Sequence, residues 1–141
     1  MGAINPTREQ IRVLGETDPG DSPIVMLNLL RFRERAEYPE GSEAKPCSGR
    51  EAYSRYAEKT LAVLEGLGGR IVWSGSALAT VIGPNGEGWD EVALVEYPSR
   101  KAFLELAATV ESSKATEHRT AGLEDTRLIA VVEGEFMPGA G

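Results

Sequence analysis

The chain has few of the side chains that form disulfides and metal sites. It contains one histidine and one cysteine, Cys47, so no internal disulfide can form and we expect a reducing compartment. No set of side chains has metal-ligand spacing, which argues against a zinc site or an iron facial triad. No stretch approaches the ~20 apolar residues that span a bilayer, and no N-terminal apolar run resembles a signal peptide. We therefore expect a cytoplasmic protein.

Positive charge is also scarce. Acidic residues outnumber Lys and Arg by 22 to 15, which gives a formal net charge of −7. Such a surface makes nucleic acid and anionic membranes poor partners. With 141 residues, 41% hydrophobic and 26% charged, the composition is that of one globular domain that needs no disulfide or metal to fold.

Hydrophobic periodicity predicts alternating helices and strands. Two capping boxes, at residues 7–10 and 48–51, begin predicted helices; a third helix follows Ser99, and a shorter one covers residues 111–120. Predicted strands cover residues 24–32, 70–74, 77–82, 89–96 and 128–132, where the second and third are either two short strands or one strand bent at Gly75.

After the first helix the order is β-α-β-β-α-β. This order predicts an α+β fold of the ferredoxin-like, split βαβ kind, with two helices on one face of a four-stranded antiparallel sheet. We divide the chain into an N-terminal helix and linker (1–22), this domain (23–134) and a flexible tail (135–141). In strand 24–32 both alternating sets of side chains are apolar, so the face without helices needs another cover. We predict a homodimer packed sheet to sheet. The polar loop 34–46 is long enough to be a lid or a dimer arm.

Four segments together resemble one family. They are "MLNLLRFRERAEYP", "GREAYSRYAEKTLAVLEGLGGRIVWSG", "VALVEYPSRKAFLEL" and "EHRTAGLEDTRLIAV". They are similar to domain-of-unknown-function family 1330, within the dimeric α/β-barrel superfamily, over residues 23–133. The turn at residues 97–100 and the pair His118-Arg119 are the most specific parts. The resemblance implies a ferredoxin-like protomer in a barrel-like dimer. It implies no single activity, because relatives on this fold include monooxygenases, isomerases, haem enzymes and stress proteins.

Asn28 is a polar residue inside an apolar strand. By alternation it shares a face with Met26 and Leu30, where an amide without partners costs about 1–3 kcal/mol. Asn28 either orients a small ligand in a pocket or ties a loop backbone to the sheet. Arg31, on the other set, either binds a substrate carboxylate with its planar fork or pairs with surface acids.

Two residues are candidates for acid–base catalysis. His118 is the side chain best suited to move protons near neutral pH, although a lone histidine near a helix end also occurs without function. By alternation Glu96 shares one strand face with Asp90 and Leu94, and it either pairs with an arginine or has a raised pKa and acts as a base. The resemblance implies a site role for His118 and for Arg119. Arg119 has the alternative of a structural ion pair with Glu96 or Asp90.

Aromatic residues complete the candidate pocket. Tyr53, in the first turn of its helix, and Trp73, just before Gly75, either line a pocket mouth or belong to the core. The glycine-rich segment 83–88 has no lysine and opens no helix, so it is not a nucleotide site, and no cofactor is expected. We expect either a cofactor-independent monooxygenase or isomerase for a small organic substrate, or a non-catalytic ligand-binding or stress-related dimer.

Overall fold

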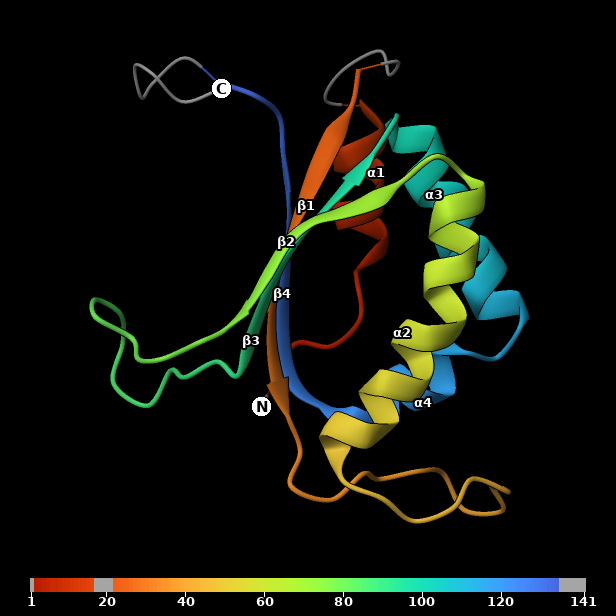
Figure 1. Ribbon diagram of the computed structural model, residues 1–141, viewed down its shortest axis with the longest axis vertical. Coiled ribbons are helices and arrows are strands. Elements are labelled where there is room, and N and C mark those ends of the chain that lie inside the picture. The colour runs from red at the N-terminus through yellow and green to blue at the C-terminus, as the bar shows by residue number, and fades with distance from the viewer. Residues whose placement is uncertain (1, 17–21, 135–141) are drawn as a thin grey trace.

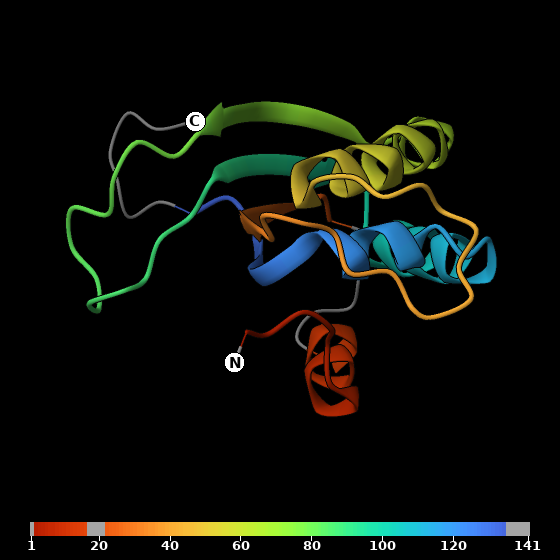
Figure 2. The ribbon, with the colours of Figure 1, turned by 90° about the horizontal axis from the view of Figure 1, so that it is seen from below.

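The computed structural model describes residues 2–16 and 22–134, and its order of elements confirms the predicted α+β class. Helices and strands follow one another as α1 (Arg8–Glu16), β1 (Ile24–Phe32), α2 (Gly49–Gly66), β2 (Arg70–Ser76), β3 (Glu91–Tyr97), α3 (Arg100–Ser112), α4 (Thr116–Gly122) and β4 (Leu123–Val131). The strands form one antiparallel sheet in the order β2-β3-β1-β4. Helices α2, α3 and α4 cover one face, and α1 lies apart from them (Figures 1 and 2).

The main core lies between the sheet and these helices. Ile24 and Met26 of β1 are buried against Leu64 of α2 and against Leu106 and Val110 of α3. Apolar side chains at every second position of a strand meet an apolar stripe on each helix, which is the pattern that the sequence predicted. Burial of each such side chain contributes about 1.5–3 kcal/mol.

Capping side chains set where the helices begin. Ser48 accepts a hydrogen bond from the Glu51 backbone N–H while Glu51 bonds back to the Ser48 N–H, so the predicted capping box is present. Ser99 caps α3 through the Ala102 N–H, and Thr7 and Gln10 form the reciprocal bonds ahead of α1. Each cap satisfies backbone donors that have no partner within the helix.

A close backbone crossing fixes the end of β1, the start of α2 and the end of α4. The Arg33 N–H donates to the Gly122 carbonyl oxygen at 2.8 Å, and the Gly49 N–H donates to the Arg33 carbonyl oxygen at 3.1 Å. A Cβ on Gly122 would overlap the Gly49 carbonyl oxygen, and a Cβ on Gly49 would overlap that of Arg33. Only glycine allows this approach. The crossing therefore determines where the loop between β1 and α2 leaves the sheet.

Two strand predictions differ from the structure. Residues 77–82 form no strand, because the Ala77 N–H closes onto the Asp90 carbonyl oxygen and the chain beyond has no neighbouring strand to pair with. Residues 77–90 instead project from the end of the sheet as an extended loop, which we call the arm (Figures 1 and 2). β4 begins five residues earlier than the predicted 128, because the polar start of β4 pairs with β1 without an apolar pattern to reveal it.

The face of the sheet opposite the helices, here called the open face, is apolar and uncovered. Leu27 lies opposite Leu94 of β3 and Ile129 of β4, and Leu94 lies opposite Trp73 of β2. Directly opposed residues share a face of an antiparallel sheet. Trp73 and Ile129 are 56% and 49% exposed. The sequence prediction of two apolar sets in β1 is thus confirmed.

The ends of the chain bear on the predicted boundaries. The Ala3 N–H donates to Asp125 and the Thr126 N–H donates to the Ala3 carbonyl oxygen, so the segment ahead of α1 runs beside β4. Most of the predicted linker and the predicted tail lie outside the described residues. Within the described ranges, no helix combines the length and the apolar character needed to cross a bilayer.

Candidate functional site beneath the β1–α2 loop

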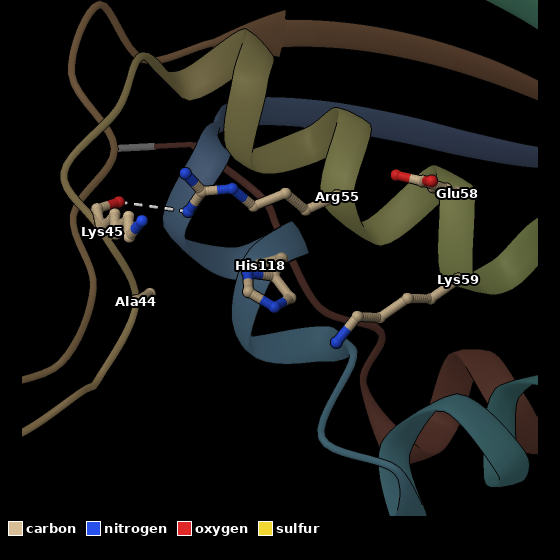
Figure 3. A pocket seen from close by; sticks show the side chains of 6 residues that line it. All are labelled: Ala44, Lys45, Arg55, Glu58, Lys59 and His118. Carbon is tan, nitrogen blue, oxygen red and sulfur yellow. Dashed lines mark hydrogen bonds between the residues drawn. The ribbon is translucent and has the colours of Figure 1, made fainter.

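An open groove of about 570 Å³ lies where the loop between β1 and α2 faces the helices. The loop supplies one wall, α2 supplies the other, and α4 places His118 between them (Figure 3). The lining side chains are Ala44, Lys45, Arg55, Glu58, Lys59 and His118. A second hollow, along α3, is lined by alanine, threonine and serine and offers no ionisable group.

The loop wall is held in place by the backbone. The Ala36 N–H donates to the Cys47 carbonyl oxygen at 3.0 Å, which closes the loop at its base. The Glu37 N–H donates to the Ala121 carbonyl oxygen of α4 at 2.9 Å. The predicted long loop is therefore packed against the rest of the chain at the end of α4.

His118 makes its main contact with Tyr38 of this loop. The Tyr38 hydroxyl oxygen lies 2.7 Å from Nδ1 of His118, and the two rings meet edge to face with centroids 5.5 Å apart. Arg55 of α2 donates from one guanidinium nitrogen to the Tyr38 hydroxyl oxygen and to the Lys45 carbonyl oxygen, each at 3.1 Å. Loop, α2 and α4 are thus joined by one set of hydrogen bonds around the imidazole.

The surroundings of His118 disfavour the charged form of its ring. Burial lowers the pKa of His118, and the positive charges of Lys59 and Arg55 lower it further against the opposing effect of Glu117. Burial also raises the pKa of the Tyr38 phenol, an effect that Arg55 opposes. A neutral imidazole beside a protonated phenol can accept a proton at its free nitrogen, which is the state that acid–base chemistry requires.

Cys47 is buried behind Tyr38. It packs with Ala52 and Ala121, with Ala36 and Tyr38 at the margin of the cluster. The Cys47 thiol interacts with the Tyr38 hydroxyl and contributes to the raised pKa of that hydroxyl. Cys47 directly follows the polar loop 34–46, and residues of this loop fold back and cover it.

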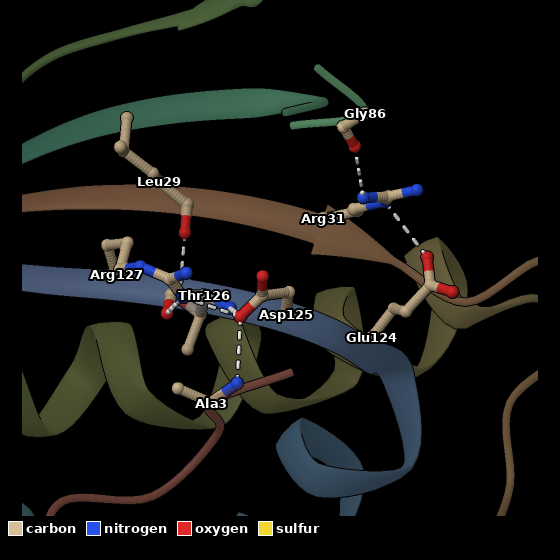
Figure 4. Close-up of polar contacts among 8 residues, drawn as sticks. All are labelled: Ala3, Leu29, Arg31, Gly86, Glu124, Asp125, Thr126 and Arg127. Carbon is tan, nitrogen blue, oxygen red and sulfur yellow. Dashed lines mark hydrogen bonds and ion pairs between the residues drawn. The ribbon is translucent and has the colours of Figure 1, made fainter. Parts of the chain in front are cut away.

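Of the predicted ligand-binding residues on β1, neither lines this groove. Asn28 lies on the helix-facing side and donates through Nδ2 to the carbonyl oxygens of Met26 and Ala93, at 3.1 and 3.4 Å. Its amide thus bonds to a carbonyl of its own strand and to one of β3, not to a loop backbone. Arg31 lies on the open face, where it pairs with Glu124 at 3.0 Å and donates to the Gly86 carbonyl oxygen (Figure 4).

Glu96 and Trp73 also lie on the open face. Glu96 is opposite Val25 and accepts from the Arg70 guanidinium at 3.1 Å, so it has the arginine partner of its structural alternative. Trp73 lies on the edge strand β2, opposite Leu94 of β3. The structure therefore separates both residues from His118 by the thickness of the sheet.

Tyr53 and Arg119 lie together between α2 and α4. Burial raises the pKa of Tyr53, and the charge of Arg119 opposes this effect. The Tyr53 ring packs on Phe32, with centroids 5.5 Å apart. Arg119 donates to the Ile4 carbonyl oxygen at 2.8 Å.

The alternative considered for Arg119, an ion pair with Glu96 or Asp90, does not form. Glu96 is paired with Arg70, and Asp90 accepts the backbone N–H of Phe32 at 2.8 Å. Alternation placed Glu96 on the correct set of β3 but did not show that the helices, with Arg119, pack on the opposite face.

Sequence reasoning missed Tyr38, Arg55 and Lys59. Arg55 and Lys59 are four residues apart on α2, so their common helix face was readable from the sequence. Tyr38 stands in an aperiodic loop, and nothing local indicates that this loop returns to α4. Among the residues that the structure describes, no group of three or more His, Cys, Asp and Glu could hold a metal ion.

Comparison with known proteins gives matches in family and in structure. The family model "Domain of unknown function (DUF1330)" matches residues 47–134, more than half of the chain. The crystal structure of methylated RPA0582 protein is 41% identical, with 99% of this chain and 98% of that chain covered and a TM-score of 0.86. Another crystal structure of RPA0582, described as a protein of unknown function from Rhodopseudomonas palustris, is 41% identical over 93% and 96% of the chains, with a TM-score of 0.83.

A more distant likeness concerns the fold alone. The hydroxynitrile lyase from Passiflora edulis is 8% identical over 84% of this chain and 99% of that one, with a TM-score of 0.50. No curated protein matches the chain. The family match, the relative at 41% identity and the antiparallel β2-β3-β1-β4 sheet together establish that the chain belongs to the DUF1330 family and has a ferredoxin-like fold.

Proposed function

We propose that the protein is a homodimer in which each protomer binds a small organic molecule in the groove and moves a proton on it through His118, without a cofactor. The observation that carries this proposal is the contact between His118 Nδ1 and the Tyr38 hydroxyl at the groove. The reaction it fits best is an isomerisation, in which one group removes a proton from one atom and returns it to another.

Tyr38 can fix the ring in the form that such a reaction needs. The hydroxyl oxygen accepts from Arg55 and has a second lone pair, which can accept from an Nδ1–H of His118. The hydrogen of the Tyr38 hydroxyl can then point toward the Cys47 sulfur, with which Tyr38 interacts. In this arrangement Nε2 carries the lone pair. Nε2 takes a proton from the bound molecule, the ring becomes an imidazolium that still donates to Tyr38, and Nε2 gives the proton back at a different atom.

The local charges favour the return of the proton. Lys59 and Arg55 oppose a positive charge on the ring, so the imidazolium is a stronger acid than free histidine. A base of moderate strength near pH 7 is the usual requirement for a residue that both accepts and donates in one cycle. Cofactor-independent oxygenation, the other enzymatic alternative, would use the same abstraction step.

Deuterium uptake tests this function. Small carbonyl compounds and unsaturated lactones that bind the protein are found by ligand-observed NMR, and their C–H exchange in D2O is then followed with wild-type protein. His118→Gln is expected to reduce exchange by about 10²–10⁴-fold, the usual contribution of a general acid–base group. Lys101→Gln, at an exposed position of α3, is the control and is expected to match wild type. Equal exchange in His118→Gln and wild type would refute the proton-transfer role.

The second candidate function is ligand binding without catalysis. It is favoured by the openness of the groove, since Lys45, Glu58 and Lys59 are exposed and water has access to any bound molecule. Compounds that bind saturably in the groove but exchange no faster than in buffer would establish this candidate in place of the enzyme.

Exposed apolar side chains on the open face and in the arm support the proposed homodimer. Ile129 and Trp73 leave apolar surface uncovered on the open face, and in the arm Leu78, Val81 and Ile82 are 99%, 91% and 94% exposed. Removal of such surface from water contributes about 25 cal/mol per Å². A second copy related by a two-fold axis would cover both open faces at once, and the arms that extend from the ends of the two sheets would be buried with them.

A further inference from the structure

We infer that the groove selects ligands that carry a carboxylate, which Lys45, Arg55 and Lys59 recognise beside His118. This assignment depends on the proposed function for the existence of the binding groove, and it names the chemical class that the groove takes.

The charge of the groove is opposite to that of the whole protein. The chain has a formal net charge of −7, yet the charged groove lining consists of Lys45, Arg55 and Lys59 against the single carboxylate of Glu58. These cations come from two separate elements, the loop and α2, which meet only in the folded chain (Figure 3). A concave patch whose sign differs from that of its surroundings raises the local concentration of ligands of opposite charge.

The groove cations are not used in ion pairs. Elsewhere in the described residues, arginines are joined to carboxylates within 4 Å, as Arg31 is to Glu124 and Arg70 to Glu96. Within the same described ranges, no ion pair joins Lys45, Arg55 or Lys59 to a carboxylate. One guanidinium nitrogen of Arg55 donates to the Tyr38 hydroxyl oxygen and to the Lys45 carbonyl oxygen. The other N–H groups of Arg55 and the ammonium groups of Lys45 and Lys59 remain as donors for a ligand.

The groove cations lie close enough to His118 to act on its charge. Lys59 and Arg55 both lower the pKa of the ring, so the field of these cations extends to the position where a ligand would lie. Glu117, on the same helix as the ring, is the group that opposes them. An anion placed among Lys45, Arg55 and Lys59 would therefore lie within the electrostatic reach of the imidazole.

A carboxylate fits these donors better than a phosphate does. Phosphate sites in proteins commonly add backbone N–H groups at a helix N-terminus or in a glycine-rich loop. The N-terminus of α2 is already capped by Ser48 and Glu51, and the groove lies along the side of the helix, at Arg55 to Lys59. Side-chain donors alone, one of them a planar guanidinium, suit a carboxylate of one or two charges.

The single histidine makes the test direct. His118 is the only histidine in the chain, so its ring protons give one set of NMR signals and one titration curve. The probes are acetate, malonate and succinate, with acetamide, malonamide and succinamide as neutral counterparts and inorganic phosphate as a second anion, all at constant ionic strength. A carboxylate in the groove is expected to shift the ring signals saturably and to raise the pKa of His118, because a nearby anion stabilises the imidazolium.

Matched variants locate the binding. Lys59→Gln is expected to weaken the binding of the best carboxylate about fivefold, the effect of losing one exposed charge contact of about 1 kcal/mol, while Lys59→Arg retains it. Lys101→Gln removes the same charge from an exposed position of α3 and is expected to change nothing. Melting temperatures equal to that of wild type show that the variants are folded.

The outcomes separate the carboxylate assignment from the proposed function. Saturable carboxylate shifts that weaken in Lys59→Gln and persist in Lys101→Gln support the assignment. Saturable shifts from the neutral amides alone, or from phosphate at equal or lower concentration, overturn it and leave a binding groove with a different ligand class. Shifts from none of these probes overturn it as well. If His118 nevertheless catalyses proton exchange on other compounds, the proposed function is retained although the carboxylate assignment is wrong.

Discussion

Tyr38 and His118 are 80 residues apart in the chain, yet the Tyr38 hydroxyl oxygen lies 2.7 Å from Nδ1 of the imidazole. The contact exists because the loop after β1 returns to α4 and is held there through Ala36 and Glu37. It brings the only histidine of the chain to a groove with three cations, and the proposed chemistry follows from that placement.

Removal of the Tyr38 hydroxyl is expected to impair proton exchange without unfolding the protein. Tyr38→Phe keeps the ring that packs against His118 and loses the group that fixes the tautomer. We expect exchange to fall about tenfold, less than for His118→Gln, because the base itself remains. Exchange rates and melting temperatures of the two variants, measured side by side, check this order. A Tyr38→Phe protein with the wild-type rate would show that the contact has no role in positioning.

His118 is expected to make the protein less stable as the pH falls. Its pKa is lowered in the folded chain, so below about 6.5 the unfolded chain binds the proton more readily than the folded one. The stability that the neutral ring contributes is present above pH 6.5 and is lost as the pH falls through the lower folded pKa.

Urea titrations between pH 7.5 and 5 measure this effect as the difference between wild type and His118→Gln. The loss of stability with falling pH is expected to be steeper in wild type. Carboxylates titrate alike in both proteins, so they cancel in the difference. An identical pH dependence in the two proteins would contradict a lowered pKa.

Asn28 is expected to support the sheet and to leave ligand binding unchanged. Asn28→Ala removes the hydrogen bonds from Nδ2 to Met26 and Ala93, and we expect the free energy of unfolding to fall by about 1 kcal/mol. Denaturant titration measures this loss, and the NMR titration of His118 measures binding. Weaker binding in a variant of unchanged stability would instead place Asn28 at a ligand.

The Gly49–Gly122 crossing is expected to be intolerant of side chains. Gly122→Ala places a Cβ against the Gly49 carbonyl oxygen, so we expect a loss of about 1–3 kcal/mol in unfolding free energy. Gly66→Ala is the matched control, since a Cβ there meets nothing within 4 Å. If both variants are as stable as wild type, the backbone approach is looser than the structure has it.

The dimer is expected to depend on the open face. Ile129→Lys places a charge among the apolar residues of β4 and is expected to shift the protein toward monomer in light scattering after size-exclusion chromatography. Lys101→Glu, on α3, alters charge away from this face and serves as the control. A wild-type protein that is monomeric at all concentrations would contradict the homodimer.

Much of the fold could be predicted from local pattern. The capping boxes at residues 7–10 and 48–51 locate two helix starts, and the alternation in residues 24–32 identifies β1 and its two apolar sets. The start of β4 was missed because residues 124–127 are all polar and show no apolar alternation. The arm was read as strand because apolar residues at 78, 81 and 82 do not reveal whether a partner strand is present.

The candidate site was only partly predictable, because its side chains come together through tertiary contacts rather than through a local sequence pattern. His118 was found because its chemistry is distinctive wherever it lies. Its partners Tyr38 and Arg55 become neighbours through the close glycine crossing and the return of a loop, which no periodicity encodes. Glu96 was assigned to the right set of side chains, but the sequence does not say which set the helices cover.

The measurement that tests the account most directly is a nitrogen-15 NMR titration of the one histidine. The chemical shifts of the two ring nitrogens report which of them carries the proton, and their pH dependence gives the pKa. The account predicts a proton on Nδ1, held by Tyr38, a pKa below about 6.5, and a change of tautomer in Tyr38→Phe. A ring protonated on Nε2, with an ordinary or raised pKa and no response to Tyr38→Phe, would contradict it.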